Sequence, residues 1–504
     1  MTRPAVFLDR DGTIIEEKGF IGSPAEVSFL PGVFSALRKL QNNFLLFIVT
    51  NQPGVGLGRL RLEEVKEVNQ FILSTLAHEG IRIQKVFTCP HRREDNCQCI
   101  KPKPYFLLQA AEEFNLDLVA SYVIGDHPSD MELARASGAR GVYLLTGHGP
   151  EHLSELAFPL PVVTNLETAV ALILEEKKAV EQAARIIREG GVIAFPTETV
   201  YGLGADAFNR LAVARVFDIK KRPRFDPLIV HIAAIQELEK LASKITEEAW
   251  RLAQHFWPGP LTLVLPKKKE VPEIVTSGLT SVAVRMPRHN LTLRVITEAV
   301  TPVVGPSANP FGYLSPTRPE HVREQLGSSV DFILDGGPCE IGVESTIVSF
   351  LERPPRLLRP GGVPVEEIER FIGHVKRKGG KSEKTLAPGM LPRHYSPSTP
   401  LVLTWSEETV LKWKKEGKRV GLLCLQGQAP SILFDHQETL SAKGDLREAA
   451  ANLFAALHRL DKAGLDLIVV DRIPEEGLGA AIMDRLRRGS SDFKNEKGKL
   501  SLLP

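Results

Sequence analysis

Short apolar runs that end in polar side chains recur through the first 150 residues. The run AVFLD ends at Asp9 and SYVIGD ends at Asp126, while FLLFIVTN ends in Thr50 and Asn51. Amphipathic stretches such as VFSALRKLQ separate these runs. Buried strands that alternate with helices predict a parallel sheet covered on both faces, and ligands of such sheets bind at the carboxyl ends of the strands. We therefore expect these four polar residues to line one site.

The alternation resumes after a connector that we expect over residues 151–178. The helical run AVEQAARIIREGG stops at two glycines, and the strand-like runs PLIVHI, LTLVLP, SVAVRMP and STIVSF follow. These runs predict a mixed α/β domain over residues 179–373. RVGLLCL and LDLIVVDRI, with a helical run between them, predict a small α/β domain over residues 401–504. Residues 374–400 are polar, basic and rich in Gly and Pro, which is typical of a linker.

Composition restricts the class of protein. A chain of 504 residues is too long to fold around one hydrophobic core, so about three domains are expected. The contents of 43% hydrophobic and 25% charged residues are those of soluble globular proteins. The sequence shows no signal-peptide pattern and no membrane-spanning run, so we expect a cytoplasmic protein with no membrane partner. The net charge of +2 gives no global field toward nucleic acid, although a local basic groove stays compatible with RNA binding.

Three of the five cysteines lie in one short segment beside a histidine. Cys89, His91, Cys97 and Cys99 supply three thiolates and one imidazole, whereas the other two cysteines lie far apart in the chain. That spacing is no disulfide framework and is consistent with a reducing compartment. A closed set of four such ligands is typical of structural zinc, because a catalytic zinc keeps one position open. The sequence therefore predicts one structural Zn²⁺ in this loop.

Carboxylates suited to a divalent cation follow two of the predicted strands. Asp9 and Asp11 stand two residues apart on a loop in which Gly12 permits a tight turn. Asp126 and Asp130 bring two further carboxylates to the same edge of the sheet. Oxygen ligands in this number suit an octahedral Mg²⁺ site.

Neutral donors and a cation complete a set for phosphoryl transfer. Thr50 and Asn51 can donate hydrogen bonds to phosphate oxygens, and Lys101 can neutralise charge on a transferring phosphoryl group. The order DxDGT, TN, Lys and GDxxxD resembles the haloacid dehalogenase-like phosphatases. The resemblance implies that Asp9 is the nucleophile and forms an aspartyl-phosphate. It also implies that Asp11 protonates the leaving group and then deprotonates water.

The same resemblance implies how Mg²⁺ is held and which substrates are expected. Asp9, Asp11 through its backbone carbonyl, and Asp126 would bind Mg²⁺, with Asp130 orienting the site from outside. The Cys-His loop resembles that of the subfamily of histidinol-phosphate phosphatase and heptose bisphosphate phosphatase. Ile100 stands where that subfamily has an arginine that would grip a second anionic group. The expected substrate is a small phosphorylated metabolite of the histidinol phosphate or heptose bisphosphate type, and both types stay open.

A second set of polar residues, in the central domain, suits a nucleotide. Lys220 and Arg222 stand one residue apart and can both face a triphosphate. Ser307 and Asn309 follow a Gly-Pro turn and suit hydrogen bonds to ribose or phosphate. Around them the segments PTETVYGLG, KKRP, DPLIVH, WPGPLT, RMP, GPSAN, EST and RPG occur in this order.

These segments closely resemble the threonylcarbamoyl-AMP synthase family, from about residue 179 to residue 504. The linker sequence HYSP and the later EEGLGAAIMDRLRRGSSD resemble its two-domain form, so the linker is interpreted as a functional lid. The resemblance implies that threonine is held by Thr197, His231 and Arg285, with Ser345 nearby. It implies that ATP is held by six residues: Lys220, Arg222, Ser307, Asn309, Arg359 and, in the lid, Tyr395.

The implied reaction uses threonine, bicarbonate and ATP. The amine of threonine captures bicarbonate as a carbamate, whose oxygen attacks the α-phosphate and expels pyrophosphate, with Mg²⁺ on the phosphates. A separate downstream transferase is expected to act on tRNA, and direct contact of this chain with tRNA stays open. We expect a Rossmann-like phosphatase domain (residues 1–150), a mixed α/β synthase domain and a small Rossmann-like C-terminal domain. The alternatives are a phosphatase-like scaffold on an active synthase, and a non-catalytic RNA-binding module.

Overall fold

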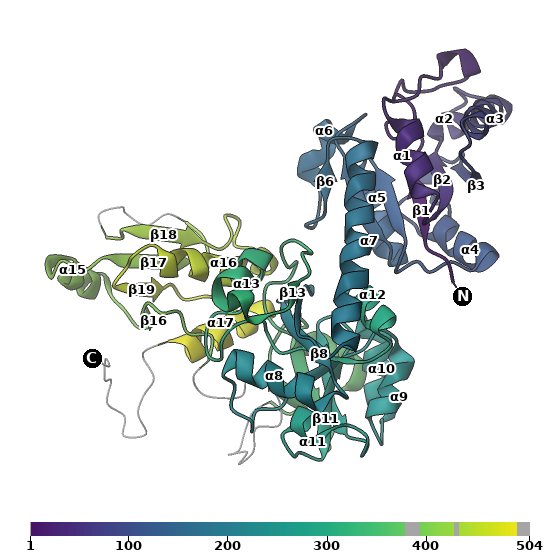
Figure 1. Ribbon diagram of the computed structural model, residues 1–504. Helices are drawn as coiled ribbons and strands as arrows, with labels where there is room; N and C mark the ends of the chain where they lie inside the picture. Colours follow the sequence, from purple (N-terminus) through teal and green to yellow (C-terminus); the bar gives the residue numbers. More distant parts are fainter. Residues whose placement is uncertain (1, 378–393, 428–432, 491–504) are drawn as a thin grey trace. The chain divides into compact units, whose positions relative to one another are not determined.

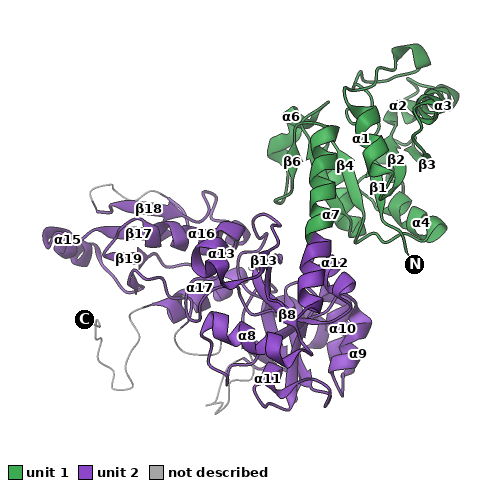
Figure 2. Ribbon diagram, viewed as in Figure 1, with its two compact units in different colours: residues 1–179 green, residues 180–504 purple. Residues whose placement is uncertain are grey.

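The chain forms two compact units in the computed structural model, residues 1–179 and residues 180–504 (Figure 2). The structure describes residues 2–377, 394–427 and 433–490. Most of the predicted linker, and the last residues of the predicted C-terminal domain, lie outside the described residues. Within the described part, none of the helices combines the length and the apolar composition that crossing a bilayer requires.

A six-stranded parallel sheet with the order β3-β2-β1-β4-β5-β6 forms the centre of unit 1 (Figure 1). Its strands are β1 (Ala5–Leu8), β2 (Leu45–Asn51), β3 (Ile83–Cys89), β4 (Tyr122–Gly125), β5 (Arg140–Leu144) and β6 (Val162–Val163). Val6 and Leu8 belong to one apolar core, and Ala5 and Phe7 belong to another. Because successive side chains point to opposite faces of a strand, the sheet is buried on both faces, as the continuous apolar runs predict.

Helices cover both faces of this sheet. The core that contains Val6 includes side chains from α1 (Val33–Leu40), α3 (Leu62–His78) and the first half of α7 (Leu166–Arg188). The core that contains Phe7 includes side chains from α4 (Tyr105–Phe114) and α5 (Pro128–Ser137). Two short helices, α2 (Pro53–Gly56) and α6 (Gly149–His152), complete the unit. The predicted three-layer α/β arrangement is confirmed.

Helix α7 occupies the last part of the predicted connector. Its buried positions follow helical spacing, first at Leu166, Ala169 and Ile173 and then at Val180 and Ile187. Buried positions at helical spacing continue through the charged sequence EEKKAV, where Glu176 is buried, so one helix of 23 residues spans the end of the expected connector and the start of the next domain.

A nine-stranded mixed sheet with the order β13-β7-β8-β12-β9-β11-β10-β14-β15 forms the larger part of unit 2. Its strands are β7 (Ile193–Phe195), β8 (Gly202–Asp206), β9 (Ile229–His231), β10 (Leu261–Pro266), β11 (Ser281–Arg285), β12 (Val303–Val304), β13 (Phe332–Ile333), β14 (Thr346–Ser349) and β15 (Arg356–Arg359). Its helices are α8 (Arg210–Lys220), α9 (Leu238–Leu241), α10 (Glu247–Phe256), α11 (Glu273–Thr276), α12 (Asn290–Ala299), α13 (Pro319–Leu326) and α14 (Val365–Ile372).

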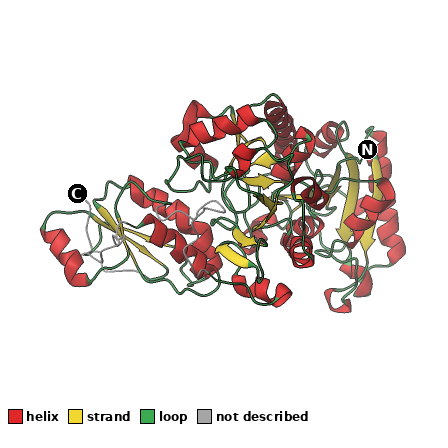
Figure 3. Cartoon of the chain, turned by 90° about the horizontal axis from the view of Figure 1, so that it is seen from below, coloured by secondary structure: helices red, strands yellow, loops and turns green. Residues whose placement is uncertain are grey.

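A four-stranded parallel sheet with the order β16-β19-β17-β18 completes unit 2 (Figure 3). Its strands are β16 (Leu401–Val402), β17 (Val420–Cys424), β18 (His436–Thr439) and β19 (Leu467–Val470), and its helices are α15 (Glu407–Lys415), α16 (Leu446–Lys462) and α17 (Leu478–Gly489). Leu453 and Leu457 of α16 share a core with Val200, Leu314 and Val343 of the larger sheet region. This shared core joins the small sheet to the larger one.

Candidate active sites

The carboxyl edge of the unit 1 sheet gathers the polar residues expected there. Asp9 directly follows β1, Asn51 ends β2 and Asp126 directly follows β4. The three strands are neighbours in the order β2-β1-β4, and all run parallel, so their carboxyl ends meet. The strand order therefore brings together residues that are more than 100 positions apart in the sequence.

Lys101 is the cation at the centre of this edge. Its Nζ lies 2.6 Å from Asp9 Oδ1 and 2.6 Å from Asp130 Oδ1, and it donates to the backbone oxygen of Val49 at 3.2 Å. Its backbone N–H donates to Asn51 Oδ1 at 3.2 Å. Burial lowers the pKa of Lys101, but Asp130 and Asp9 outweigh it and raise that pKa above its ordinary value. The lysine is therefore a fixed positive charge beside the expected nucleophile.

Asp11 is held by other side chains than those that hold Lys101. Arg10 donates to both of its carboxylate oxygens, at 2.9 and 3.0 Å, and Gln52 Nε2 donates to Asp11 Oδ2 at 2.8 Å. The hydroxyl of Thr50 lies 3.5 Å from the same oxygen. Burial raises the pKa of Asp11 in spite of the opposing charge of Arg10. A carboxyl group with a raised pKa suits proton transfer to a leaving group.

Three carboxylates at this edge fit a divalent cation. Oxygens of Asp9, Asp126 and Asp130 all lie within 4.8 Å of one another. Burial and the charges of Asp9 and Asp130 raise the pKa of Asp126 to about 8, because the three groups repel each other. Gly12 has a φ of +74°, and a Cβ there would lie 2.1 Å from Asp126 Oδ2. The glycine therefore lets the loop approach the cluster, and an oxygen set of this kind suits Mg²⁺.

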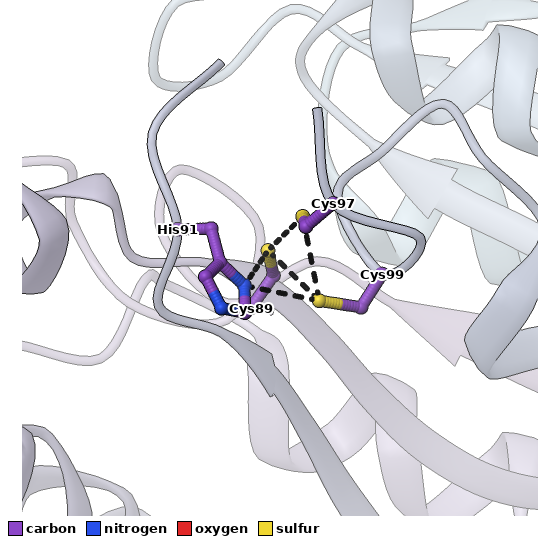
Figure 4. Close-up of side chains that lie close together, drawn as sticks. All are labelled: Cys89, His91, Cys97 and Cys99. Carbon is purple, nitrogen blue, oxygen red and sulfur yellow. Dashed lines mark hydrogen bonds between the residues drawn. The ribbon is translucent and has the colours of Figure 1, made fainter. Parts of the chain in front are cut away.

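The four predicted zinc ligands lie together, at the end of β3 and in the loop that follows it (Figure 4). Cys99 Sγ lies 3.3 Å from Cys89 Sγ and 3.4 Å from His91 Nδ1. Cys97 Sγ lies 3.6 Å from each of the other two sulfurs. A tetrahedron with zinc–sulfur bonds of about 2.3 Å has edges of about 3.7 Å, so the four atoms have the spacing that this metal requires.

In unit 2, strand register places two expected threonine ligands side by side. His231 ends β9 and Arg285 ends the parallel strand β11, and the two residues are direct partners in the register. Arg285 Nη2 lies 2.8 Å from Glu198 Oε1, with the two side chains 5% and 1% exposed. Thr197 Oγ1 donates to the backbone oxygen of Val200 and accepts the N–H of that residue, which fixes the turn beside Glu198. The structure thus pairs Arg285 with a carboxylate of the chain itself.

The expected ATP ligands form a neighbouring cluster of buried cations. Lys220 Nζ donates to the backbone oxygens of Ser307 and Asn309, the latter at 2.6 Å. Arg222 Nη2 lies 2.8 Å from Asp226 Oδ2, and this guanidinium also donates to the Asp226 backbone oxygen at 3.0 Å. Burial and the nearby Arg222 lower the pKa of Lys220 well below its ordinary value. In the described part of the chain, no carboxylate forms an ion pair with Lys220 Nζ.

Arg359 and Ser345 belong to this cluster as well. Arg359 Nη2 donates to the backbone oxygen of Ser345 at 3.0 Å and to its Oγ at 3.2 Å. That hydroxyl also lies 2.8 Å from Thr262 Oγ1. Ser345 therefore lies beside Arg359, an expected ATP ligand.

Two adjacent linker residues pack against the same cluster. The His394 ring lies 5.6 Å from Phe311, whose ring faces the Arg222 guanidinium at 5.9 Å. Tyr395 is 2% exposed. Among the described residues, the buried atoms His394 Nδ1, Tyr395 Oη and Asn309 Oδ1 have no hydrogen-bond partner. Buried polar atoms are normally paired, so this concentration of unpaired atoms indicates the place of a ligand.

Sequence reasoning missed the carboxylates and one arginine that hold these sites together. Glu198, Asp226 and Glu344 occur in the recognised segments but received no role, and each forms a buried ion pair with an arginine. Arg485, from α17, is the partner of Glu344. Gln52, which holds Asp11, follows the recognised TN pair directly. A buried carboxylate beside a known ligand is the signal that could have identified the first three.

Comparisons with known proteins agree with this division. The family described as telomere recombination (Sua5, YciO and YrdC) matches residues 185–361, and the C-terminal domain of threonylcarbamoyl-AMP synthase matches residues 363–491. The family of haloacid dehalogenase-like hydrolases matches residues 98–169.

Individual relatives cover both parts of the chain. Threonylcarbamoyl-AMP synthase of Pyrococcus abyssi is 45% identical and covers 64% of this chain and 98% of its own length. The Bacillus subtilis enzyme is 43% identical, over 62% of this chain and 92% of its own length. D-glycero-beta-D-manno-heptose-1,7-bisphosphate 7-phosphatase of Yersinia pestis is 37% identical, over 27% of this chain and 76% of its own length. The crystal structure of P. abyssi Sua5 with L-threonine superposes with a TM-score of 0.59 at 46% identity, over 62% of this chain and 94% of that one.

The fold and the comparisons define a fusion of a haloacid dehalogenase-like phosphatase region with a synthase region of the Sua5 type. The high coverage of the synthase relatives settles the family of the larger part. The chain belongs to the threonylcarbamoyl-AMP synthase family.

Proposed function

We propose that residues 180–490 join threonine, bicarbonate and ATP into L-threonylcarbamoyladenylate, which a separate transferase uses to modify tRNA. The observation that carries the nucleotide site is the buried Lys220, whose ammonium contacts backbone carbonyls and has no carboxylate as a partner in the described chain. A buried cation is costly unless an opposite charge compensates it. The phosphates of ATP would supply that charge, with Arg222 and Arg359 on either side.

Threonine and bicarbonate would meet beside the nucleotide. His231 and Arg285 are paired in register, and Gly305, which precedes the Ser307 loop, lies so close that a Cβ there would be 2.6 Å from His231 Nδ1. Arg285 would bind the threonine carboxylate with the N–H groups that Glu198 does not use. Burial lowers the pKa of His231 well below its ordinary value, so a neutral imidazole faces the substrate. The site would act mainly by positioning the reactants and neutralising charge.

Unit 1 would be a phosphatase that acts on a small phosphorylated metabolite. Asp9 would attack the phosphorus, Asp11 would protonate the leaving oxygen, and Lys101 would neutralise charge on the phosphoryl group. Asp9, Asp126 and the backbone carbonyl of Asp11 would hold Mg²⁺, which supplies further charge neutralisation when bound. The tight fixation of Asp11 by Arg10 and Gln52 favours an active enzyme over a scaffold, since a scaffold has no need of a positioned buried acid.

The Cys-His loop would carry one structural Zn²⁺. Its four ligand atoms have the spacing of a closed tetrahedron, which leaves no position for a substrate. The loop ends two residues before Lys101, so the metal would hold the lysine segment in place. Asn51, which accepts the Lys101 backbone N–H, would fix the other side of the same segment.

Replacement of Arg222 by alanine is expected to weaken the use of ATP. One charge-assisted contact contributes about 1.5–3 kcal/mol, so the KM for ATP should rise by about 10- to 150-fold while threonine binding persists. Pyrophosphate release, dependent on threonine and bicarbonate, measures the reaction. The exposed Arg224 supplies the matched control, because Arg224→Ala removes the same charge outside the cluster. An unchanged ATP dependence in Arg222→Ala contradicts the assigned role.

Replacement of Asp9 by asparagine is expected to abolish Mg²⁺-dependent hydrolysis of p-nitrophenyl phosphate and to leave adenylate synthesis at its original rate. The nucleophile is lost, whereas the synthase residues lie in the other unit. Both activities are measured on the same preparation, and Glu112→Gln, at an exposed carboxylate of unit 1, is the control. Equal loss of both activities would refute the assignment of separate sites.

Replacement of Cys99 by serine is expected to reduce bound zinc from about one ion per chain to a small fraction of that, because a hydroxyl is a poor zinc ligand. Elemental analysis of protein purified without chelator gives the stoichiometry. Cys424→Ser, at a buried cysteine of unit 2, should keep the zinc of the unaltered chain. A zinc-free unaltered protein rules the site out.

A further inference from the structure

Arg485, one turn before the end of α17, is buried without any exposed side-chain area. Its Nε donates to Glu344 Oε2 at 2.7 Å, and its Nη1 donates to the backbone oxygen of Pro360 at 2.7 Å. Glu344 and Pro360 are the neighbours in sequence of Ser345 and Arg359. The C-terminal domain therefore inserts one arginine directly behind the nucleotide cluster.

The same arginine also touches the linker. Its guanidinium carbon lies 5.3 Å from the centre of the Tyr395 ring. The last turn of α17 also contacts the linker, because His394 donates its backbone N–H to the backbone oxygen of Arg488 at 3.1 Å. Gly489 approaches so closely that a Cβ there would lie 2.6 Å from the Tyr395 backbone oxygen. Helix α17 thus holds both linker residues that pack against the ATP ligands.

Glu344 connects Arg485 with the cluster of expected ATP ligands. Its second oxygen accepts a hydrogen bond from Ser315 Oγ at 2.5 Å, so both carboxylate oxygens are fixed. Burial would raise the pKa of Glu344, but the charges of Arg485 and Arg359 hold that pKa below its ordinary value. The next residue, Ser345, accepts the hydrogen bonds of Arg359. A short chain of fixed groups therefore runs from α17 to an expected ATP ligand.

We infer that Arg485 is a positioning residue of the synthase site, through which the C-terminal domain fixes Tyr395 and the Glu344–Ser345 segment against the nucleotide. The inference rests on the proposed ATP site. Its competitor is a purely structural role, in which Arg485 only joins the two parts of unit 2. The two roles differ in what they affect: positioning acts on ATP binding, whereas a structural role acts on stability and on both substrates alike.

The test uses the full-length chain with Arg485→Lys, which keeps a positive charge beside Glu344 so that the carboxylate is not left unpaired in the interior. The lysine cannot reproduce the planar contact with Tyr395 together with the three hydrogen bonds of the guanidinium, to Glu344, Pro360 and Asp484. Arg487→Gln is the matched control, because Arg487 lies on the same helix, pairs with Glu475 and is 51% exposed. Calorimetry gives the Kd of ATP and the Kd of threonine separately, and thermal unfolding gives the Tm.

Arg485→Lys is expected to raise the Kd of ATP by about tenfold, the size of one lost charge-assisted contact, with the Kd of threonine within about twofold. Arg487→Gln is expected to change neither value. An unchanged ATP affinity in Arg485→Lys, or a parallel loss of both substrates together with a lower Tm, overturns the positioning role. A wild-type chain that binds no ATP overturns the proposed function and this inference together, whereas ATP binding without adenylate formation affects the proposed function alone.

A double-mutant cycle with Tyr395→Ala tests whether Arg485 affects ATP affinity through the Tyr395 ring. If Arg485 acts through the Tyr395 ring, Arg485→Lys should change ATP affinity by less than about threefold in the Tyr395→Ala background, since interacting residues give non-additive effects. A full, additive loss in that background refutes the route through Tyr395. The double variant Glu344→Gln/Arg485→Gln removes both charges together, so neither is left unpaired. A weakened ATP affinity in this folded variant supports the positioning role of Arg485.

Discussion

Both candidate active sites depend on one constraint: charged side chains must be buried without loss of stability. Unit 2 buries three arginines against three carboxylates, in the pairs Arg285–Glu198, Arg222–Asp226 and Arg485–Glu344. Removing one partner of such a pair leaves an uncompensated charge, which costs about 3–5 kcal/mol. The pairs therefore fix the arginines in place before any ligand arrives. Lys220 has no carboxylate as an ion-pair partner in the described part of the chain. We therefore expect the negative charge of a ligand to lie beside it.

Unit 1 meets the same constraint in a smaller space. Lys101 lies between Asp9 and Asp130, and Arg10 pairs with Asp11, so the two cations neutralise different carboxylates. Burial raises the pKa of Asp126, and the charges of Asp9 and Asp130 raise it further. The remaining negative charge is the property that makes this edge of the sheet suitable for a divalent cation.

Alternating apolar runs were sufficient to predict the sheets and most strands, because buried parallel strands are marked by continuous apolar sequence. Candidate site residues could be named from the sequence where they lie in short motifs at strand ends, such as Asp9 and Asn51, and the structure brings these two to one edge of the sheet. Glu198 and Asp226 stand in the recognised segments, and Asp226 is an i,i+4 partner of Arg222, so both could have been proposed as partners. Arg485 could not, because its contact with Glu344 joins residues 141 positions apart. Helix α7 extends across the expected boundary between connector and domain, because buried positions keep helical spacing through its charged middle.

The C-terminal domain has a different relation to the synthase site than unit 1 has. Every residue of the proposed phosphatase set lies between Asp9 and Asp130, within unit 1, so none of these side chains comes from unit 2. The synthase cluster, in contrast, receives Arg485 from α17 and shares an apolar core with α16. Because a buried ion pair and a common core both cross between the two sheets of unit 2, separating those sheets would expose charge and apolar surface at once. The two sheets of unit 2 therefore form one structural unit, and the smaller sheet region supplies a buried ion-pair partner to the candidate nucleotide site.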